Sequence, residues 1–267
     1  MHTRLEHPSP VANALLHAAD RTAIRLLTRF ADPYVVVMDQ QMHQYIRSRY
    51  GIRDERLVPI PVGVDADRFA QPTQRSIRTE LGIDDAPLIL SIGHVIPIRN
   101  RVTLVEALPA VRAVHPNARL VVVGAVYDDR FLERARQLGV EDAIVCTGKV
   151  ARDEIPDYVA AADIEAHDLE GIGLGTASLE VMAAGVPTIA AVRPDNFLGL
   201  TLRNWQDLVM VEPGNHRQLS DAIARLLDDA ALRAELGDNQ RKLIAEHFAM
   251  DVVADAHRDL YRRAISR

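Results

Sequence analysis

A glycine-rich turn that runs into a short apolar helix is the stretch of this sequence best suited to hold a charged ligand. The turn begins at Glu170, and the helix ends before Pro187. Glycine lets a backbone approach a ligand without interference from a Cβ atom, and the first turn of a helix presents N–H groups at the positive end of its dipole. The pattern predicts an anion site at this turn, where Gly173 and Gly175 allow a close approach of the backbone.

A second loop carries two arginines between a predicted strand and a predicted helix. Gly93 and His94 follow an apolar run, and Arg99 and Arg101 precede the helix. A guanidinium is always charged and suits phosphate oxygens, whereas a cation at a helix N-terminus opposes the dipole unless an anion is bound there. The alternative is an arginine pair that only faces solvent. We favour phosphate binding by Arg99 and Arg101, with His94 as a further donor.

Glu180 lies inside an otherwise apolar helix. A carboxylate there is unfavourable unless a polar group meets it, and an ionised carboxylate only accepts hydrogen bonds. Ribose hydroxyls would satisfy it; the alternative is a neighbouring arginine or backbone group. His167 directly follows a predicted strand and is expected at the same edge. Together with the arginine loop, these residues predict a nucleotide diphosphate held from two sides.

The elements that must position these residues alternate between strands and helices. Such alternation predicts an α/β fold, a Rossmann-like parallel sheet with helices on both faces, whose ligands bind at the carboxyl ends of the strands. Both glycine-bearing loops follow strands and precede helices, so we expect them at one edge. The predicted strands are 34–38, 57–61, 87–92, 119–123, 143–147, 163–166 and 187–192; the predicted helices are 9–30, 39–50, 101–114, 129–138, 153–161, 176–184, 216–227 and the stretch from 230, with a linker at 70–79.

The composition excludes several classes of protein. The chain has 267 residues and a net charge of -6, and an acidic balance argues against nonspecific nucleic-acid binding, which depends on Lys and Arg. Cys146 is the single cysteine, so an intrachain disulfide or cysteine-rich metal site is excluded, and its apolar surroundings predict a buried, inert thiol. No metal-ligand spacing is present, and we expect no metal and no cofactor.

The location expected from the sequence is the cytoplasm. No apolar run is long enough to span a bilayer, and the N-terminus is too polar for a signal peptide. The helix over 9–30 has apolar residues on one side and Arg21, Arg25 and Arg29 on another. This pattern fits a membrane-surface stripe or a solvated helix face, and we favour the second. Membrane contact is expected to be at most peripheral, at the inner face.

Several stretches together resemble the donor half of family 4 retaining glycosyltransferases of the GT-B fold. The resemblance covers roughly residues 32–265. The stretches that carry it are Ser91 to Arg99, Gly148-Lys149-Val150, Gly175 to Pro187, the hinge Ile60 to Phe69, and Val211 to Asn215.

The resemblance implies a role for each matched position. Gly93 and His94 are similar to the glycine–arginine start of the family's pyrophosphate loop, and Arg99 falls at its phosphate-binding lysine. Glu180 matches the second glutamate of the E-x7-E motif, which holds ribose. The first glutamate would fall at position 172, which is Ile172 here, and Glu170 lies two residues earlier. Gly175, Thr176 and Ala177 would offer backbone N–H groups to the distal phosphate. The expected substrate-binding set is completed by Val150, His167, Glu170 and Gly173, and Arg99 and Glu180 are the expected catalytic residues.

The resemblance also implies the activity and the domains. We expect a hexosyltransferase that moves a sugar from a nucleotide-diphosphate sugar to an acceptor hydroxyl, or the donor-binding part of a split or truncated enzyme. The alternative is a non-catalytic nucleotide-sugar-binding or partner subunit. The expected parts are an acceptor-domain remnant with the hinge (1–66), the donor domain (67–248) and a C-terminal helix returning to the N-terminal part (249–267).

Most of the family's acceptor domain has no counterpart in this sequence. Strand 34–38 would then expose apolar faces and unpaired edges. We therefore expect a protein partner or a second copy of the chain to cover residues 9–61.

Overall fold

A computed structural model describes residues 9–69, 75–99, 101–167, 169–171 and 173–266. The chain forms two compact units, and each is described by itself. Unit 1 comprises Met1–Pro61, Phe197–Gly199 and Ala256–Arg267, and unit 2 comprises Val62–Asn196 and Leu200–Asp255. The last helix contributes residues to both units.

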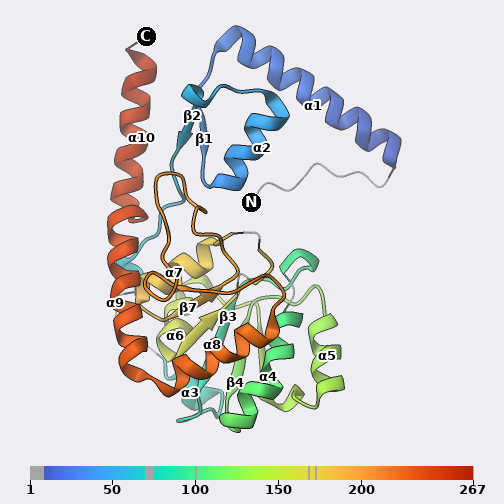
Figure 1. Cartoon of the computed structure of the whole chain (residues 1–267), viewed down its shortest axis with the longest axis vertical. Coiled ribbons are helices and arrows are strands. Elements are labelled where there is room, and N and C mark those ends of the chain that lie inside the picture. Colours follow the sequence, from blue (N-terminus) through green and yellow to red (C-terminus); the bar gives the residue numbers. More distant parts are fainter. Residues whose placement is uncertain (1–8, 70–74, 100, 168, 172, 267) are drawn as a thin grey trace. The chain divides into compact units, whose positions relative to one another are not determined.

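Unit 2 contains a six-stranded parallel sheet with the order β5-β4-β3-β6-β7-β8. Figure 1 labels three of its strands, β3, β4 and β7. The α/β fold predicted from the alternating pattern is thereby confirmed. Its strands are β3 (Leu88–Ile92), β4 (Arg119–Val123), β5 (Ile144–Gly148), β6 (Ile164–Ala166), β7 (Thr188–Ala190) and β8 (Val209–Met210). Strand β8 was not predicted, because a two-residue strand has no periodicity to recognise.

Helices cover both faces of this sheet, and alternate strand residues face opposite layers. The helices of unit 2 are α3 (Ile77–Glu80), α4 (Val102–Val114), α5 (Arg130–Leu138), α6 (Ile155–Ala161), α7 (Thr176–Ala184), α8 (His216–Asp228), α9 (Ala230–His247) and the start of α10 (Met250–Ile265). Ile89 of β3 packs with α4, α5 and α8, whereas Leu88 and Leu90 pack with α3, α6 and α7. The two layers are therefore built from the same strands.

The linker predicted at 70–79 is partly wrong. Residues 77–79 belong to α3, because Ile77 is 2% exposed and anchors that helix in the core beneath β3. Residues 70–74 lie outside the described part of the chain.

Strands β3 and β6 are parallel neighbours at the centre of the sheet. From β3 the chain passes to β4 on one side, whereas β6 is followed by β7 on the other. Crevices at such switch points are where open α/β sheets bind ligands. The loop after β3 and the loop after β6 leave from this point. The prediction that both glycine-bearing loops share one edge is therefore confirmed.

Helix α7 is held at its C-terminal end by α9. A Cβ atom on Gly237 of α9 would lie 2.1 Å from the carbonyl oxygen of Gly185, so only glycine permits this approach. Arg241 of α9 donates to the carbonyl oxygen of Ala184 at 2.9 Å. Both contacts satisfy or cover the end of α7 and thereby set its position against the sheet.

The expectation of a buried thiol at Cys146 is wrong, because this side chain is exposed. Cys146 lies in β5, the first strand in the sheet order, and this strand is only partly covered. Partial burial still raises the pKa of the thiol, which disfavours the reactive thiolate.

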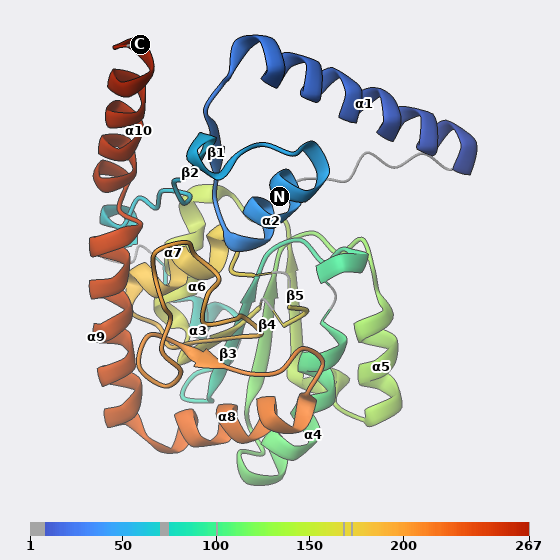
Figure 2. The same ribbon diagram turned by 45° about the horizontal axis from the view of Figure 1, so that its top comes forward.

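Unit 1 is built from α1 (Pro10–Ala31), β1 (Val35–Val37), α2 (Gln40–Tyr50) and β2 (Leu57–Pro59), together with Phe197–Gly199 and part of α10 (Figure 2). Strands β1 and β2 pair in parallel. Its small core consists of Val37, Ile46, Ile52 and Leu57. Gly51 ends α2 in the left-handed conformation, at φ 70°.

Polar contacts join α1 to α2. Asp20 accepts hydrogen bonds from Arg49 at 3.1 Å and from the Tyr50 hydroxyl at 2.8 Å. Burial and the bond to Asp20 raise the pKa of Tyr50 to about 12. These hydrogen bonds hold α1 and α2 together through polar side chains.

The sequence predicted exposed apolar faces on strand 34–38, but the exposed large apolar side chains of unit 1 lie mainly on α1, with Tyr261 and Ile265 on α10. Val37 is fully buried, whereas α1 has no buried residue. Exposed apolar side chains of α1 include Val11, Leu15, Leu26, Leu27 and Phe30. Among the described residues, no helix combines the length and the apolar character needed to cross a membrane.

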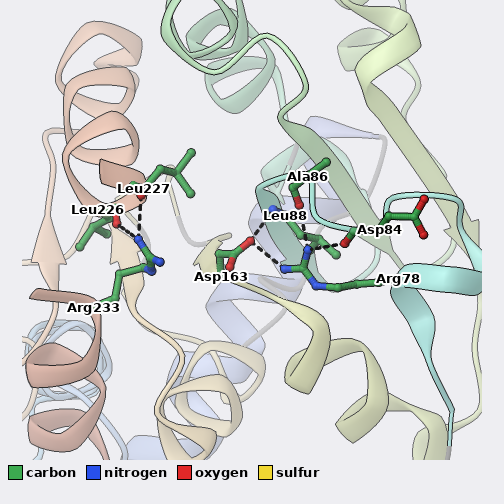
Figure 3. Close-up of polar contacts among 8 residues, drawn as sticks. All are labelled: Arg78, Asp84, Ala86, Leu88, Asp163, Leu226, Leu227 and Arg233. Carbon is green, nitrogen blue, oxygen red and sulfur yellow. Dashed lines mark hydrogen bonds and ion pairs between the residues drawn. The ribbon is translucent and has the colours of Figure 1, made fainter. Parts of the chain in front are cut away.

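At the amino ends of β3 and β6, a polar cluster joins these strands to α3 (Figure 3). Oδ2 of Asp163 accepts from the Leu88 backbone N–H at 2.7 Å and from Arg78 at 2.8 Å. Arg78 also donates to the carbonyl oxygens of Asp84 and Ala86. In the same view, Arg233 donates to the Leu226 and Leu227 carbonyls and thereby caps α8.

We predict that Asp163→Ala lowers the free energy of unfolding of unit 2 by about 1–3 kcal/mol, because it leaves the Leu88 N–H and part of the Arg78 guanidinium without an acceptor. Chemical denaturation of the full chain measures this change. The control is Asp142→Ala, which also removes an arginine partner but at an exposed carboxylate, and which should cost under about 1 kcal/mol. Equal losses for the two variants would contradict the assignment.

Candidate functional site

The loop after β3 is fixed to the loop after β4 by backbone and side-chain hydrogen bonds. The Gly93 N–H donates to the Val123 carbonyl at 2.8 Å, and the Val95 N–H donates to the Ala125 carbonyl at 3.0 Å. Nδ1 of His94 accepts from the Ala125 N–H at 3.0 Å. Because Nδ1 is an acceptor, a neutral His94 carries its proton on Nε2. Its exposed ring can therefore donate from Nε2, as expected from the sequence.

Arg101 lies elsewhere than the sequence had indicated. It is fully buried and not a donor at an open edge. Its guanidinium donates to the carbonyl oxygens of Arg99 at 2.5 Å and Gly93 at 3.2 Å, and to Nδ1 of His167 at 2.7 Å. Arg101 thus connects both ends of the first loop to the strand end of the second loop.

His167 is a buried, neutral imidazole at the end of β6. Burial, and then the charges of Arg101 and Arg99, hold its pKa well below the usual value. Since Arg101 can only donate, Nδ1 of His167 accepts and Nε2 carries the proton. The ring lies against Gly93, which has φ +137°, and a Cβ atom there would be 2.6 Å from Cε1 of His167. His167 is therefore at the predicted strand end, packed against the first loop.

Arg99 is the arginine of this loop that keeps free hydrogen-bonding capacity. It ends a 3-10 helix over Pro97–Arg99 and is half-buried. Its Nε is buried and, within the described part of the chain, has no hydrogen-bond partner. A buried guanidinium nitrogen without an acceptor is unfavourable unless a ligand supplies one. This geometry suits the anion contact predicted for Arg99.

The glycine-rich turn after β6 approaches the loop after β7. Gly173 has φ +88°, and a Cβ atom on it would lie 2.8 Å from Oδ1 of Asn196. Asn196 is 5% exposed, and its Nδ2 has no partner within the described residues. Residues 168 and 172, the latter the expected place of a first glutamate, lie outside the described residues.

Glu170 lies at the start of this turn and is partly buried. Burial raises the pKa of its carboxyl, while the charge of Arg101 and a hydrogen bond with Thr103 act in the opposite direction. Glu170 is therefore linked to the same buried arginine as His167.

Helix α7 begins at Thr176 with Gly175 as its N-cap, and no side chain caps it. Thr176 is exposed and Ala177 half-buried, so the backbone of the first turn is the feature that can meet an anion. Ser178 donates from its hydroxyl to Oε1 of the buried Glu165 on β6, at 3.3 Å. This bond fixes the start of α7 on the sheet. The sequence holds one sign of this bond, because Glu165 is an acidic residue within an otherwise apolar strand and needs a polar partner.

Glu180 is half-buried and has a distant ion-pair partner. Its Oε1 lies 3.8 Å from Nη1 of Arg68, which is beyond hydrogen-bond distance. Burial raises the pKa of Glu180, against the charges of Arg68 and Arg152. Nη2 of Arg68 has no partner among the described residues. Both groups thus keep hydrogen-bonding capacity for a ligand.

Arg68 was missed as a site residue by sequence reasoning. It stands in the recognised hinge stretch, in a 3-10 helix over Asp67–Phe69, but nothing in that stretch shows that it reaches Glu180. Val150 was expected to bind substrate. It follows β5, and its side chain packs against the apolar core. Strand β4 separates β5 from β3 in the sheet. Within the described residues, no cluster of histidine, cysteine, aspartate or glutamate is arranged to hold a metal ion.

We predict that Gly93→Ala lowers the free energy of unfolding by about 2–4 kcal/mol, since the new Cβ atom adds backbone strain to a clash with the buried His167 ring. Thermal and chemical denaturation measure the loss. Gly139→Ala is the control: this residue has φ +67° with nothing within 4 Å of its Cβ position, so it should cost only about 1–2 kcal/mol. A Gly93 variant no worse than this control would contradict the close packing.

Comparison with known proteins identifies relatives of this chain. It is 32% identical over 235 residues to a GDP-mannose-dependent alpha-(1-6)-phosphatidylinositol monomannoside mannosyltransferase of Mycobacterium tuberculosis. The matched region covers 82% of this chain and 60% of the relative. It is 29% identical over 254 residues to a D-inositol 3-phosphate glycosyltransferase of Kineococcus radiotolerans, covering 88% of this chain and 58% of the relative. The chain thus spans about 60% of the length of these relatives.

The fold is shared with solved glycosyltransferase structures. The crystal structure of Anabaena HepE in complex with UDP superposes with a TM-score of 0.76 at 21% identity, over 94% of this chain and 68% of that one. The family described as "Glycosyl transferases group 1" matches residues 73–243, which include both loops of the site and α7. The chain therefore belongs to the glycosyl transferases group 1 family.

Proposed function

We propose that unit 2 binds the donor of a retaining glycosyltransferase, and that the chain transfers a sugar from a nucleotide-diphosphate sugar to an acceptor hydroxyl. One observation carries the proposal: Arg99 and the N-terminus of α7 follow two neighbouring strands, β3 and β6, and so lie at the same edge of the sheet. The buried Nε of Arg99 has no hydrogen-bond partner in the described chain. Two sources of positive charge at one sheet edge suit a diphosphate.

The diphosphate is the leaving group of this reaction. Negative charge develops on it as the bond to the sugar breaks, and the sugar acquires oxocarbenium character. Arg99, the α7 N-terminus and the His94 Nε2–H would stabilise that charge from fixed positions. Arg101 would act as a positioning residue, because its hydrogen bonds hold the Arg99 and Gly93 carbonyls. In this proposal the chain's own residues supply the positive charge, and no metal or cofactor takes part.

Glu180 would accept hydrogen bonds from the ribose hydroxyls. Its ion-pair partner Arg68 lies at 3.8 Å and therefore leaves the carboxylate oxygens able to accept. The base would be guanine or uracil: one relative is named GDP-mannose-dependent, and a structural neighbour was solved with UDP.

The chain spans about 60% of its relatives' length. In the proposed reaction it would act either by itself or as the donor-binding part of a split or truncated enzyme. A protein partner or second copy over residues 9–61 stays a prediction, as do the expected cytoplasmic location and the peripheral membrane contact. The alternative, a non-catalytic nucleotide-sugar-binding subunit, rests on the isoleucine at position 172, whereas the family match supports the enzyme.

A calorimetric comparison of GDP, UDP and inorganic pyrophosphate tests these roles. We predict that Arg99→Gln weakens all ligands that bind by about tenfold or more, because it removes a charge-assisted contact to phosphate. Glu180→Gln should weaken GDP or UDP similarly and leave pyrophosphate unchanged, because pyrophosphate has no ribose. The control is Arg136→Gln on α5, which removes an exposed guanidinium paired with Glu141.

Three outcomes would count against the proposal. If neither nucleotide binds to the wild-type chain, unit 2 has no donor site. If Glu180→Gln loses affinity for pyrophosphate, Glu180 does not act through the ribose. Equal losses in the Arg99 and Arg136 variants would reduce the effect of Arg99 to general electrostatics.

The affinity for nucleoside diphosphate should also depend on pH through Glu180. Burial raises the pKa of this carboxyl, so it protonates at a higher pH than an exposed glutamate and loses acceptor capacity as the pH falls. We predict that affinity decreases between about pH 7.5 and about pH 5 more steeply in the wild type than in Glu180→Gln. The variant corrects for titration of the ligand itself, and parallel pH profiles would contradict the prediction.

A further inference from the structure

Unit 1 contains a cavity of about 330 Å³ that the donor site does not use. It is bounded by the C-terminal ends of α1 and α2 and by the segment that precedes β2. Four of the described residues that line it are arginines, and a single one is acidic. The lining residues are Arg25, Thr28, Arg29, Asp32, Pro33, Tyr50, Gly51, Ile52, Arg53 and Arg56.

Arg56 is the buried member of this group, at 7% exposure. Its Nε donates to Oδ1 of Asp32 at 2.8 Å, its Nη2 pairs with the same carboxylate, and its guanidinium lies over the Tyr34 ring. Its Nη1 is buried and has no hydrogen-bond partner among the described residues. Burying a guanidinium N–H without an acceptor is unfavourable, so an acceptor is expected to enter the cavity.

The other three arginines add charge that the protein neutralises only in part. Arg53 shares Asp32 with Arg56, at 3.1 Å. Arg25 and Arg29 lie one turn apart on α1, and no side-chain acceptor contacts either guanidinium within the described chain.

Helix ends account for only part of this charge. The C-termini of α1 and α2 each carry about half a negative charge, which favours arginines nearby. Added to the carboxylate of Asp32, the two helix ends offset roughly two of the four positive charges that line the cavity. An excess of roughly two positive charges therefore remains, which matches the charge of one phosphate monoester.

We propose that this arginine cavity binds the phosphate group of a phosphate ester. Guanidinium forks bind phosphate oxygens in pairs, and four of them around one cavity exceed what a single carboxylate ligand needs. The phosphate could belong to a soluble phosphate ester or to an anionic lipid headgroup. The exposed Leu26, Leu27 and Phe30, which are neighbours of Arg25 and Arg29 on α1, would contact acyl chains in the second case.

The test uses Arg25→Gln/Arg29→Gln, a variant of two exposed residues that leaves the Arg56–Asp32 pair intact. The matched control is Arg21→Gln/Arg217→Gln, which removes the same charge at exposed positions outside the cavity. All chains carry Arg99→Gln, so that the donor site contributes little phosphate binding. Inorganic phosphate is titrated by calorimetry, and sedimentation measures binding to phosphatidylcholine vesicles with and without phosphatidylglycerol.

We expect the cavity variant to lose about tenfold or more in affinity for inorganic phosphate and the control to lose less than about twofold. A matching loss on phosphatidylglycerol vesicles would identify a lipid headgroup as the source. Binding of phosphate that depends on the cavity, with equal vesicle binding by both variants, would identify a soluble ester. No phosphate binding, or equal losses in cavity and control variants, would overturn the proposal.

Discussion

The hydrogen bond between Arg101 and His167 is the interaction on which the site geometry depends. It joins the loop after β3 to the end of β6, and it forms only if the imidazole is neutral, because the guanidinium has no acceptor to offer. Burial and two neighbouring arginines maintain that neutrality by lowering the pKa of His167. The same guanidinium holds the Gly93 and Arg99 carbonyls, so a single buried cation sets the path of the whole first loop.

Placing one arginine inside the protein determines what remains for a ligand. Arg101 uses its donors within the protein, whereas Arg99 keeps a buried Nε without a partner in the described residues. On the neighbouring loop, Gly175 cannot cap α7 with a side chain, and the Ser178–Glu165 bond fixes where that helix begins. Glu180 and Arg68 are close but not bonded. At this edge of the sheet, Arg99, Arg68 and Glu180 are therefore held in place and keep hydrogen-bonding capacity for a ligand.

Unit 1 is organised on a different physical basis. Its apolar core is small, and α1 buries none of its residues, so ion pairs and hydrogen bonds from Asp20 and Asp32 connect its elements. Polar contacts of this kind orient helices without covering their apolar sides. The exposed apolar residues of α1 and the arginine cavity are two consequences of that design.

The sequence by itself determined the α/β fold, the edge shared by both loops and the family, because periodicity and glycine placement are local properties of the chain. Helix 176–184 and strand 119–123 match their predicted bounds for this reason. Tertiary structure decided which arginine is buried, that Cys146 is exposed, and that Arg68 reaches Glu180. Arg99 and Arg101 are two residues apart with the same chemistry, and only the position of His167, from another strand, separates their roles. Burial depends on neighbours that are distant in the sequence, and no local pattern records them.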